Sequence, residues 1–267
     1  MIEADTSVQV ATANNGALPV LGAYGRLYPE KRNNAILLTS NPGFLPQRYI
    51  AMLLAPVLND SDQPADMHLA TVAETLAAQG WCVVPDFMPA DVWKPLAEEA
   101  RRMYAAGGFR LARVGRGEGA KIRPEIRTDR VHWIDPLDPS VLQQASLDRI
   151  EEMRLSINNS LMLGLFAYEG HFALYPKGCF YRRHLDRFAD ARHRTVSCIQ
   201  YLNEDWKNED GGELRLYLPD GKGGESYTDI RPQGGTAVFF MSGDFEHMVM
   251  PSSRERLSLT GWFCQRR

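Results

Sequence analysis

Apolar residues recur every three or four positions in three segments of the chain, which predicts three amphipathic helices. These segments span residues 66–80, 89–106 and 147–163. Asp66 can cap the first helix, and Gly80 can end it. A short apolar run at 81–84, directly before a proline, predicts a buried strand.

The pattern changes after Leu165 from helical spacing to short runs rich in β-branched and aromatic residues. Glycine, proline, aspartate and asparagine separate these runs, as is typical of strands joined by turns. The runs lie at 166–175, 195–202, 213–218, 236–241, 245–250 and 257–264. Helices followed by six strands predict an α+β chain whose working core is a β-sandwich or barrel.

The first part of the chain differs from the rest in composition. Residues 1–64 are rich in asparagine, alanine, glycine and proline and hold only short apolar runs. We interpret them as an N-terminal extension, partly ordered on the main domain. We expect the polar segment 59–64, which ends in proline, to be the linker between this extension and the main domain. The main domain is then expected at 65–267.

Charge and cysteine content narrow the class of protein. The formal net charge of −3 argues against a general nucleic-acid or anionic-membrane binder, which would carry a basic excess. No apolar run approaches the roughly 18 residues of a membrane span, and the first residues lack the features of a secretory signal. Four scattered cysteines without a CxxC unit indicate reduced thiols in a cytoplasmic protein.

A candidate metal site begins at His184-Leu185-Asp186. On a strand, residues i and i+2 point to the same face, so the imidazole and the carboxylate converge. His247, 63 residues later in another predicted strand, can supply a third ligand. Two histidines and one carboxylate on one octahedral face are the ligand set of iron(II) oxygenases, with three positions left open. Taken alone, the tripeptide favours a surface histidine near an aspartate over a metal site.

Arg256 follows His247 by nine residues and stands at the entrance of the last predicted strand. Its guanidinium group can hold a carboxylate by two hydrogen bonds. A dicarboxylate co-substrate that chelates iron at one end needs such an anchor at the other. The alternative is a surface arginine in a basic turn with Arg254.

The segment Tyr175–Asp186 closely resembles the iron-binding stretch of 2-oxoglutarate-dependent prolyl hydroxylases. Within that family it is similar to the branch of the animal hypoxia-inducible-factor prolyl hydroxylases and their bacterial relatives. The resemblance extends from about Trp81 to Phe263. Further matches lie at Ile126–Ile134, Ser197–Asn203, Asp205-Trp206, Gly211–Arg215, Val238–Phe240 and Arg256–Phe263.

The resemblance implies a double-stranded β-helix, a jelly-roll or cupin-like barrel, supported by the N-terminal helices. It implies that His184, Asp186 and His247 are both the iron ligands and the catalytic residues. The implied cofactors are Fe(II), 2-oxoglutarate as co-substrate and dioxygen. The resemblance also allows ascorbate as a further cofactor.

The resemblance also assigns roles around the iron. Arg256 would bind the distal carboxylate of 2-oxoglutarate together with Tyr201, and Tyr175 would belong to the same pocket. The other implied residues are Thr260 and Trp262 beside the iron, and Arg194, Asp129, Arg127 and Trp262 on the substrate side, with Asp129 as the salt-bridge partner of Arg194. Gly261 replaces a bulkier apolar residue of the family, which bears on the width of the pocket. On sequence alone, Tyr201 and Trp262 are also compatible with core packing.

The implied substrate is a prolyl residue in a protein or peptide, hydroxylated at its 4-position, and for bacterial relatives this protein is elongation factor Tu. The basic, glycine-rich stretch Val114–Pro124 lies where the family has a lid over the peptide. Two alternatives remain: the same chemistry on a free amino acid or peptide natural product, and a non-catalytic binding module. The intact ligand set argues against the second alternative. No nucleic-acid or membrane partner is expected, and no oligomeric state is predicted.

Overall fold

The computed structural model describes residues 19–21, 27–29, 65–115, 119–187, 193–220 and 223–266. The chain divides into two units, Met1–Gln63 and Pro64–Arg267. The first unit contains an antiparallel pair of short strands, β1 (Pro19–Leu21) and β2 (Leu27–Pro29). The rest of the predicted N-terminal extension lies outside the described residues, so the extension stays a prediction.

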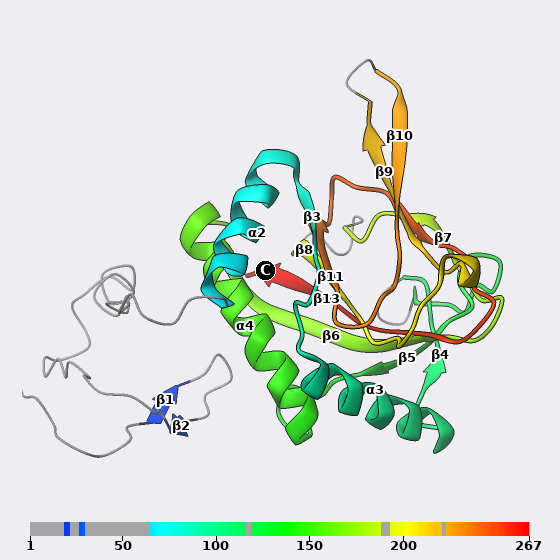
Figure 1. The fold of residues 1–267 in the computed structure, drawn as a ribbon, viewed down its shortest axis with the longest axis horizontal. Coiled ribbons are helices and arrows are strands. Elements are labelled where there is room, and N and C mark those ends of the chain that lie inside the picture. Colours follow the sequence, from blue (N-terminus) through cyan, green and yellow to red (C-terminus); the bar gives the residue numbers. More distant parts are fainter. Residues whose placement is uncertain are drawn as a thin grey trace, which may run out of the picture. The chain divides into compact units, whose positions relative to one another are not determined.

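Three helices lie along one side of the second unit (Figure 1). They are α2 (Ala65–Gln79), α3 (Ala90–Ala105) and α4 (Val141–Leu161). Asp66 lies inside α2 and is not its cap, whereas Gly80 follows the helix with a φ of +80°, which glycine adopts readily. The α4 helix begins earlier than predicted, because Ser140 caps it by accepting a hydrogen bond from the backbone N–H of Gln143 at 3.1 Å. None of the described helices is long and apolar enough to span a bilayer.

Two antiparallel sheets form the barrel, and the predicted α+β class is confirmed. The larger sheet has the order β3-β11-β8-β13-β6-β5-β4 and the smaller one β10-β9-β12-β7, the arrangement of a double-stranded β-helix. The larger sheet comprises β3 (Trp81–Val84), β4 (Arg110–Leu111), β5 (Arg130–Trp133), β6 (Leu165–Tyr175), β8 (Arg194–Tyr201), β11 (Ala237–Met241) and β13 (Arg256–Gln265). The smaller sheet comprises β7 (Tyr181–His184), β9 (Leu214–Pro219), β10 (Glu225–Ile230) and β12 (His247–Val249).

The two faces of the larger sheet serve different purposes. On β13, Leu257, Leu259 and Phe263 belong to a core shared with the helices. Their neighbours Thr260 and Trp262 point the other way and line a cavity between the two sheets. This alternation has the period of two residues that is expected of a strand. The helices therefore pack on the outer face of the larger sheet, and the inner face of that sheet is available to form the site.

Gly261 lies on the helix-facing side of β13, so it does not set the width of the cavity, contrary to expectation. A Cβ atom at this position would lie 2.3 Å from the hydroxyl oxygen of Tyr168 and 2.5 Å from the backbone oxygen of Glu169. The Tyr168 side chain also crosses Gly170, the neighbour of Gly261 across the strands. The glycine thus admits an aromatic side chain into the outer core.

We expect Gly261→Ala to lower the free energy of unfolding by about 1–3 kcal/mol, because overpacking forces the strand or the tyrosine to move. Urea unfolding measures this loss. Gly119→Ala is the matched control, since nothing lies within 4 Å of its added Cβ. Equal stability of the two variants would contradict this account of Gly261.

Candidate active site

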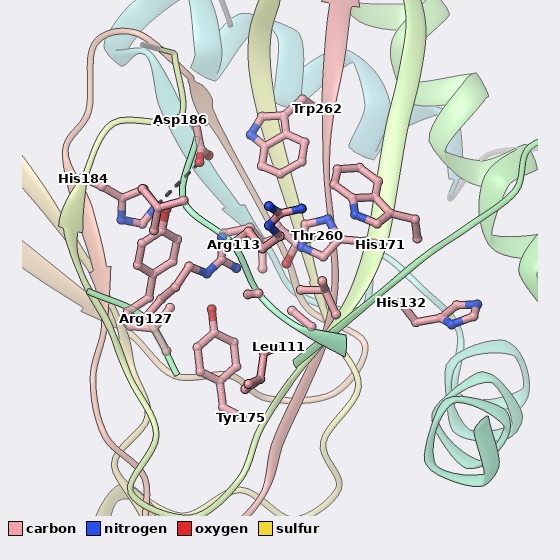
Figure 2. A pocket seen from close by; sticks show the side chains of 18 of the residues that line it. Leu111, Arg113, Arg127, His132, His171, Tyr175, His184, Asp186, Thr260 and Trp262 are labelled. Carbon is pink, nitrogen blue, oxygen red and sulfur yellow. Dashed lines mark ion pairs between the residues drawn. The ribbon is translucent and has the colours of Figure 1, made fainter. Parts of the chain in front are cut away.

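A cavity of about 700 Å³ lies between the two sheets. Strands β4, β5, β6, β8 and β13 of the larger sheet contribute one wall, and β7, β9 and β12 of the smaller sheet contribute the other. Figure 2 shows side chains from both walls converging on this space. The predicted residues Tyr175, Arg256, Thr260 and Trp262 all line it.

His184, Asp186 and His247 meet at one end of the cavity. The register of β12 with β7 places His247 directly opposite His184. The Nε2 atom of His184 lies 3.6 Å from Oδ1 of Asp186, and Nε2 of His247 lies 3.6 Å from Oδ2. One ligand atom from each residue falls within 4.8 Å of the other two, so the three can hold one metal ion. Asp186 follows the end of β7, yet its carboxylate still turns toward the histidines (Figure 2).

Hydrogen bonds orient these side chains. The Nδ1 atom of His184 lies 2.7 Å from the backbone oxygen of Arg182, and Nδ1 of His247 lies 3.3 Å from that of Phe245. Because Nδ1 donates to a carbonyl, Nε2 keeps its lone pair for a metal. The hydroxyl of Ser197 donates to Oδ2 of Asp186 at 2.7 Å. Ser197 was not among the predicted site residues, since only the fold brings it to Asp186.

The protonation states also suit a metal site. Burial raises the pKa of Asp186, but His247, His184 and the hydrogen bond from Ser197 together hold it well below its usual range. Burial and the neighbouring His184 lower the pKa of His247 to about 4. Near neutral pH the site therefore offers a carboxylate and a neutral imidazole, the forms that bind metals.

Removal of the Ser197 hydroxyl should weaken metal binding. We expect Ser197→Ala to lower the affinity for Fe(II) or Mn(II) by about 10–100-fold, the usual cost of losing a partner that orients a ligand. Metal titration under anaerobic conditions measures the change. Ser146→Ala is the control, because this buried serine bonds to Gln200 on the helix-facing side, away from the cavity. Unchanged affinity in Ser197→Ala would contradict this role.

A second polar group occupies the cavity wall between the sheets. Arg256 is 1% exposed, and its Nε donates to the backbone oxygen of Gly212 at 2.8 Å. Its Nη2 and the hydroxyl of Tyr201 are buried without a hydrogen-bond partner among the described residues. Burial raises the pKa of Tyr201 to about 12, so its hydroxyl keeps the proton that it can donate. Two such unsatisfied donors are costly unless an acceptor binds there, and a carboxylate fits.

The comparisons with known proteins agree with this chemistry. The sequence model of the 2OG-Fe(II) oxygenase superfamily matches residues 170–264, a range that holds the three candidate ligands and Arg256. A crystal structure of a Pseudomonas putida prolyl-4-hydroxylase is 46% identical, with a TM-score of 0.66, and covers 74% of this chain and 100% of that one. This chain belongs to the prolyl hydroxylases of that superfamily. The cofactors of the family are Fe(II) and 2-oxoglutarate.

Animal prolyl hydroxylases are more distant relatives. Human Egl nine homolog 1 is 29% identical over 208 residues, which are 74% of this chain and 46% of that protein. The hypoxia-inducible factor prolyl hydroxylase of Caenorhabditis elegans is 31% identical over 72% of this chain and 27% of its own. This chain spans about half the length of the Egl nine homologs that it matches. A Trichoplax adhaerens prolyl hydroxylase solved with a hypoxia-inducible factor peptide shares the fold, with a TM-score of 0.67 at 22% identity.

The predicted ion pair between Asp129 and Arg194 is wrong in this member of the family. Arg127 instead binds Asp129 through two hydrogen bonds of 2.8 and 2.6 Å. Arg194 donates to Glu169 at 2.6 Å. The physical reason is local: Arg127 and Asp129 are two residues apart on one extended segment. Arg127 and Arg194 both line the cavity, whereas Asp129 is fully buried behind Arg127.

Aromatic rings cover the part of the cavity beside the candidate ligands. The ring of Trp262 stacks on His171 with centroids 5.4 Å apart, and the guanidinium carbon of Arg194 lies 3.4 Å from the Trp262 ring centroid. Burial, followed by the charges of Arg127 and Arg194, lowers the pKa of His171 to about 3, so this imidazole is neutral. His171 was not predicted as a site residue. Its place opposite Thr260 follows from the register of β6 with β13.

The glycine-rich stretch Val114–Pro124 contributes to the cavity through its described flanks. Val114, Gly115 and Ala120 line the cavity, and the backbone groups of Val114 and Lys121 pair at 2.8 and 2.9 Å. Residues 116–118 lie outside the described part of the chain. The flanks therefore lie beside the cavity that Arg127 and Arg194 also line.

Proposed function

We propose that this chain is a 2-oxoglutarate- and Fe(II)-dependent dioxygenase that hydroxylates a prolyl residue in a protein or peptide. One observation carries the proposal: a buried His-Asp-His cluster and Arg256, whose Nη2 has no partner among the described residues, line the same cavity, and the Tyr201 ring lies 5.1 Å from the guanidinium carbon of Arg256. A metal chelated by one end of 2-oxoglutarate needs donors at the other end, and this cavity offers both.

His184, Asp186 and His247 would hold the iron and leave three positions for exogenous ligands. The Nη2 of Arg256 and the hydroxyl of Tyr201 would bind the distal carboxylate of 2-oxoglutarate. When bound, Fe(II) and 2-oxoglutarate supply the oxidation of a C–H bond by dioxygen.

The remaining residues of this chain bind, orient and exclude water. Tyr175 points its hydroxyl into the cavity beside Arg127 (Figure 2), and we assign it to the co-substrate pocket. Thr260 and Trp262 would limit the space beside the iron, so that the substrate rather than water occupies it. Arg127 and Arg194 would contact the polar backbone of the substrate, with Asp129 holding Arg127 in place.

A prolyl substrate is supported by the Pseudomonas putida prolyl-4-hydroxylase. The similarity covers the whole of that chain and 74% of this one. The Trichoplax adhaerens structure with a hypoxia-inducible factor peptide supports a peptide segment as the bound form. We propose elongation factor Tu as the first protein to test. A small-molecule substrate such as a free amino acid is the second candidate, and it is favoured only by the burial of His171 and Trp262, which line the cavity.

The test is hydroxylation in vitro. We expect incubation with Fe(II), 2-oxoglutarate and purified elongation factor Tu, or a bacterial lysate, to add one oxygen atom to a prolyl residue. Peptide mass spectrometry locates the modification, and the His247→Ala variant serves as the inactive control. Modification of free proline alone would reject the protein substrate, and turnover that persists in His247→Ala would reject the iron assignment.

A further inference from the structure

A second group of metal-ligating side chains lies apart from the candidate iron ligands. Glu169, His193 and Cys264 each place one ligand atom within 4.8 Å of the other two. Within the described ranges, this group and the His-Asp-His cluster are the two such groups of three or more. Neither the proposed hydroxylation nor the family resemblance uses the second group.

The fold brings these three residues together from separate segments. Glu169 lies in β6, His193 directly precedes β8, and Cys264 lies near the end of β13. In the register of β13, Trp262 faces Glu169, and Cys264 faces Arg194, the residue after His193. Two strands thus fix the positions of Glu169 and Cys264, and His193 lies in the turn that leads into β8. A ligand on a strand is held more rigidly than one on a loop.

The three side chains are largely buried, but solvent still reaches Glu169. Cys264 is 6% exposed, and the side chains of His193 and Glu169 are 10% and 30% exposed. An ion can enter on the side of Glu169, while the thiol is shielded by protein. Glu169 also lines the cavity of the proposed active site.

The spacing suits a small tetrahedral ion. Nε2 of His193 lies 3.6 Å from Oε1 of Glu169, and two nitrogen or oxygen ligands of tetrahedral zinc are about 3.4 Å apart. His193 and Glu169 therefore need only a small movement to bind one metal, and the thiol of Cys264 lies within 4.8 Å of both ligand atoms. The thiol of Cys264 donates a weak hydrogen bond to the backbone oxygen of Trp262 at 3.6 Å. This bond is lost when the thiol ionises to bind a metal, and the loss costs little because the bond is weak.

The donor set decides which ion is preferred. A thiolate, an imidazole and a carboxylate are ligands of zinc and similar borderline ions, and the two negative charges neutralise a dication. Three protein ligands leave a fourth position for water. The His-Asp-His cluster has no sulfur, so the two sites differ in the metals that they select.

Arg194 competes with a metal for Glu169, since its Nε donates to Oε1 at 2.6 Å. The same Oε1 lies 3.6 Å from His193, but a carboxylate oxygen has two lone pairs, so Oε1 can accept from Arg194 and still bind a metal. Such an outer partner fixes the carboxylate and supports the site. Arg194 also packs on Trp262, so the guanidinium group has a second contact that keeps it in position.

We propose that Glu169, His193 and Cys264 form a second metal site, which binds a thiophilic divalent ion of the zinc class beside the active-site cavity. Cobalt(II) is the probe, because a cobalt–thiolate bond gives a near-ultraviolet charge-transfer absorption that histidine and carboxylate ligands do not give. Tag-free protein of full length should bind two equivalents of Co(II) and show this band.

Variants separate the two sites. Asp186→Ala should lose one equivalent and keep the thiolate band. Cys264→Ser should lose the band and keep the equivalent at the His-Asp-His cluster, which also proves that it is folded. Glu169→Gln should retain the fold and weaken the second equivalent by about tenfold or more. Cys179→Ser, outside both clusters, is the matched control and should bind as the unmodified chain does.

A single equivalent without the band in the unmodified chain would overturn the second site. A band that survives Cys264→Ser, or one that disappears in Cys179→Ser, would assign the thiolate to another cysteine. Unchanged affinity in Glu169→Gln would show that this carboxylate is not a ligand and would also overturn the proposal. None of these results depends on hydroxylase activity.

Discussion

Asp186→Ala is expected to reduce 2-oxoglutarate turnover to below about a thousandth of that of the unmodified chain, equivalent to several kcal/mol of lost metal catalysis. Asp186 supplies the single carboxylate of the cluster, and its two oxygens face His184 and His247. Without it, two imidazoles remain to hold the iron, with no negative charge to offset the dication. Succinate release measures turnover, and an Fe(II) titration of the same sample measures the lost binding.

The control for this experiment is Asp138→Ala, an exposed aspartate in the loop before α4. This variant should turn over 2-oxoglutarate at the unmodified rate. Thermal unfolding of Asp186→Ala is measured alongside, so that turnover lost in a folded variant is distinguished from unfolding. Normal iron affinity in the folded Asp186→Ala variant would be incompatible with the proposed ligand set.

The metal ligands and Arg256 could be predicted from the sequence because their chemistry is local and unusual. A histidine and an aspartate two residues apart, a later histidine and an arginine beyond it restrict the possible sites severely. The resemblance supplied the double-stranded β-helix. Strand β10 was not predicted, because its residues, Glu225–Ile230, are mostly polar and carry no apolar alternation.

The errors concern side chains whose neighbours depend on strand register. Ser197 reaches Asp186, and His171 lies beside Trp262, only after β8, β6 and β13 are aligned. The same holds for Arg194, which meets Glu169 across the sheet and not Asp129. A pattern of residue types along one chain determines which face a residue occupies, but it does not determine which residue stands opposite.

The anchor for the co-substrate gives the second large effect. We expect Arg256→Lys to raise the KM for 2-oxoglutarate by about 100-fold, while the KM for the peptide changes little. An ammonium group cannot reproduce both the bond to Gly212 and the free Nη2 donor, and each hydrogen bond to a charged group is worth about 1.5–3 kcal/mol. Steady-state kinetics with each substrate varied in turn separate the two KM values.

Tyr201→Phe tests the second proposed donor to the distal carboxylate of 2-oxoglutarate. This variant loses one neutral donor, so its KM for 2-oxoglutarate should rise by only about 5–10-fold, equivalent to about 1 kcal/mol. Arg254→Lys, at an exposed neighbour of Arg256, should leave the KM unchanged. If both Arg256→Lys and Tyr201→Phe raised the peptide KM and left that of 2-oxoglutarate unchanged, the two buried donors would bind the substrate. The co-substrate would then be anchored elsewhere in the cavity, and Tyr175 and Arg127, which line it, would be the next residues to change.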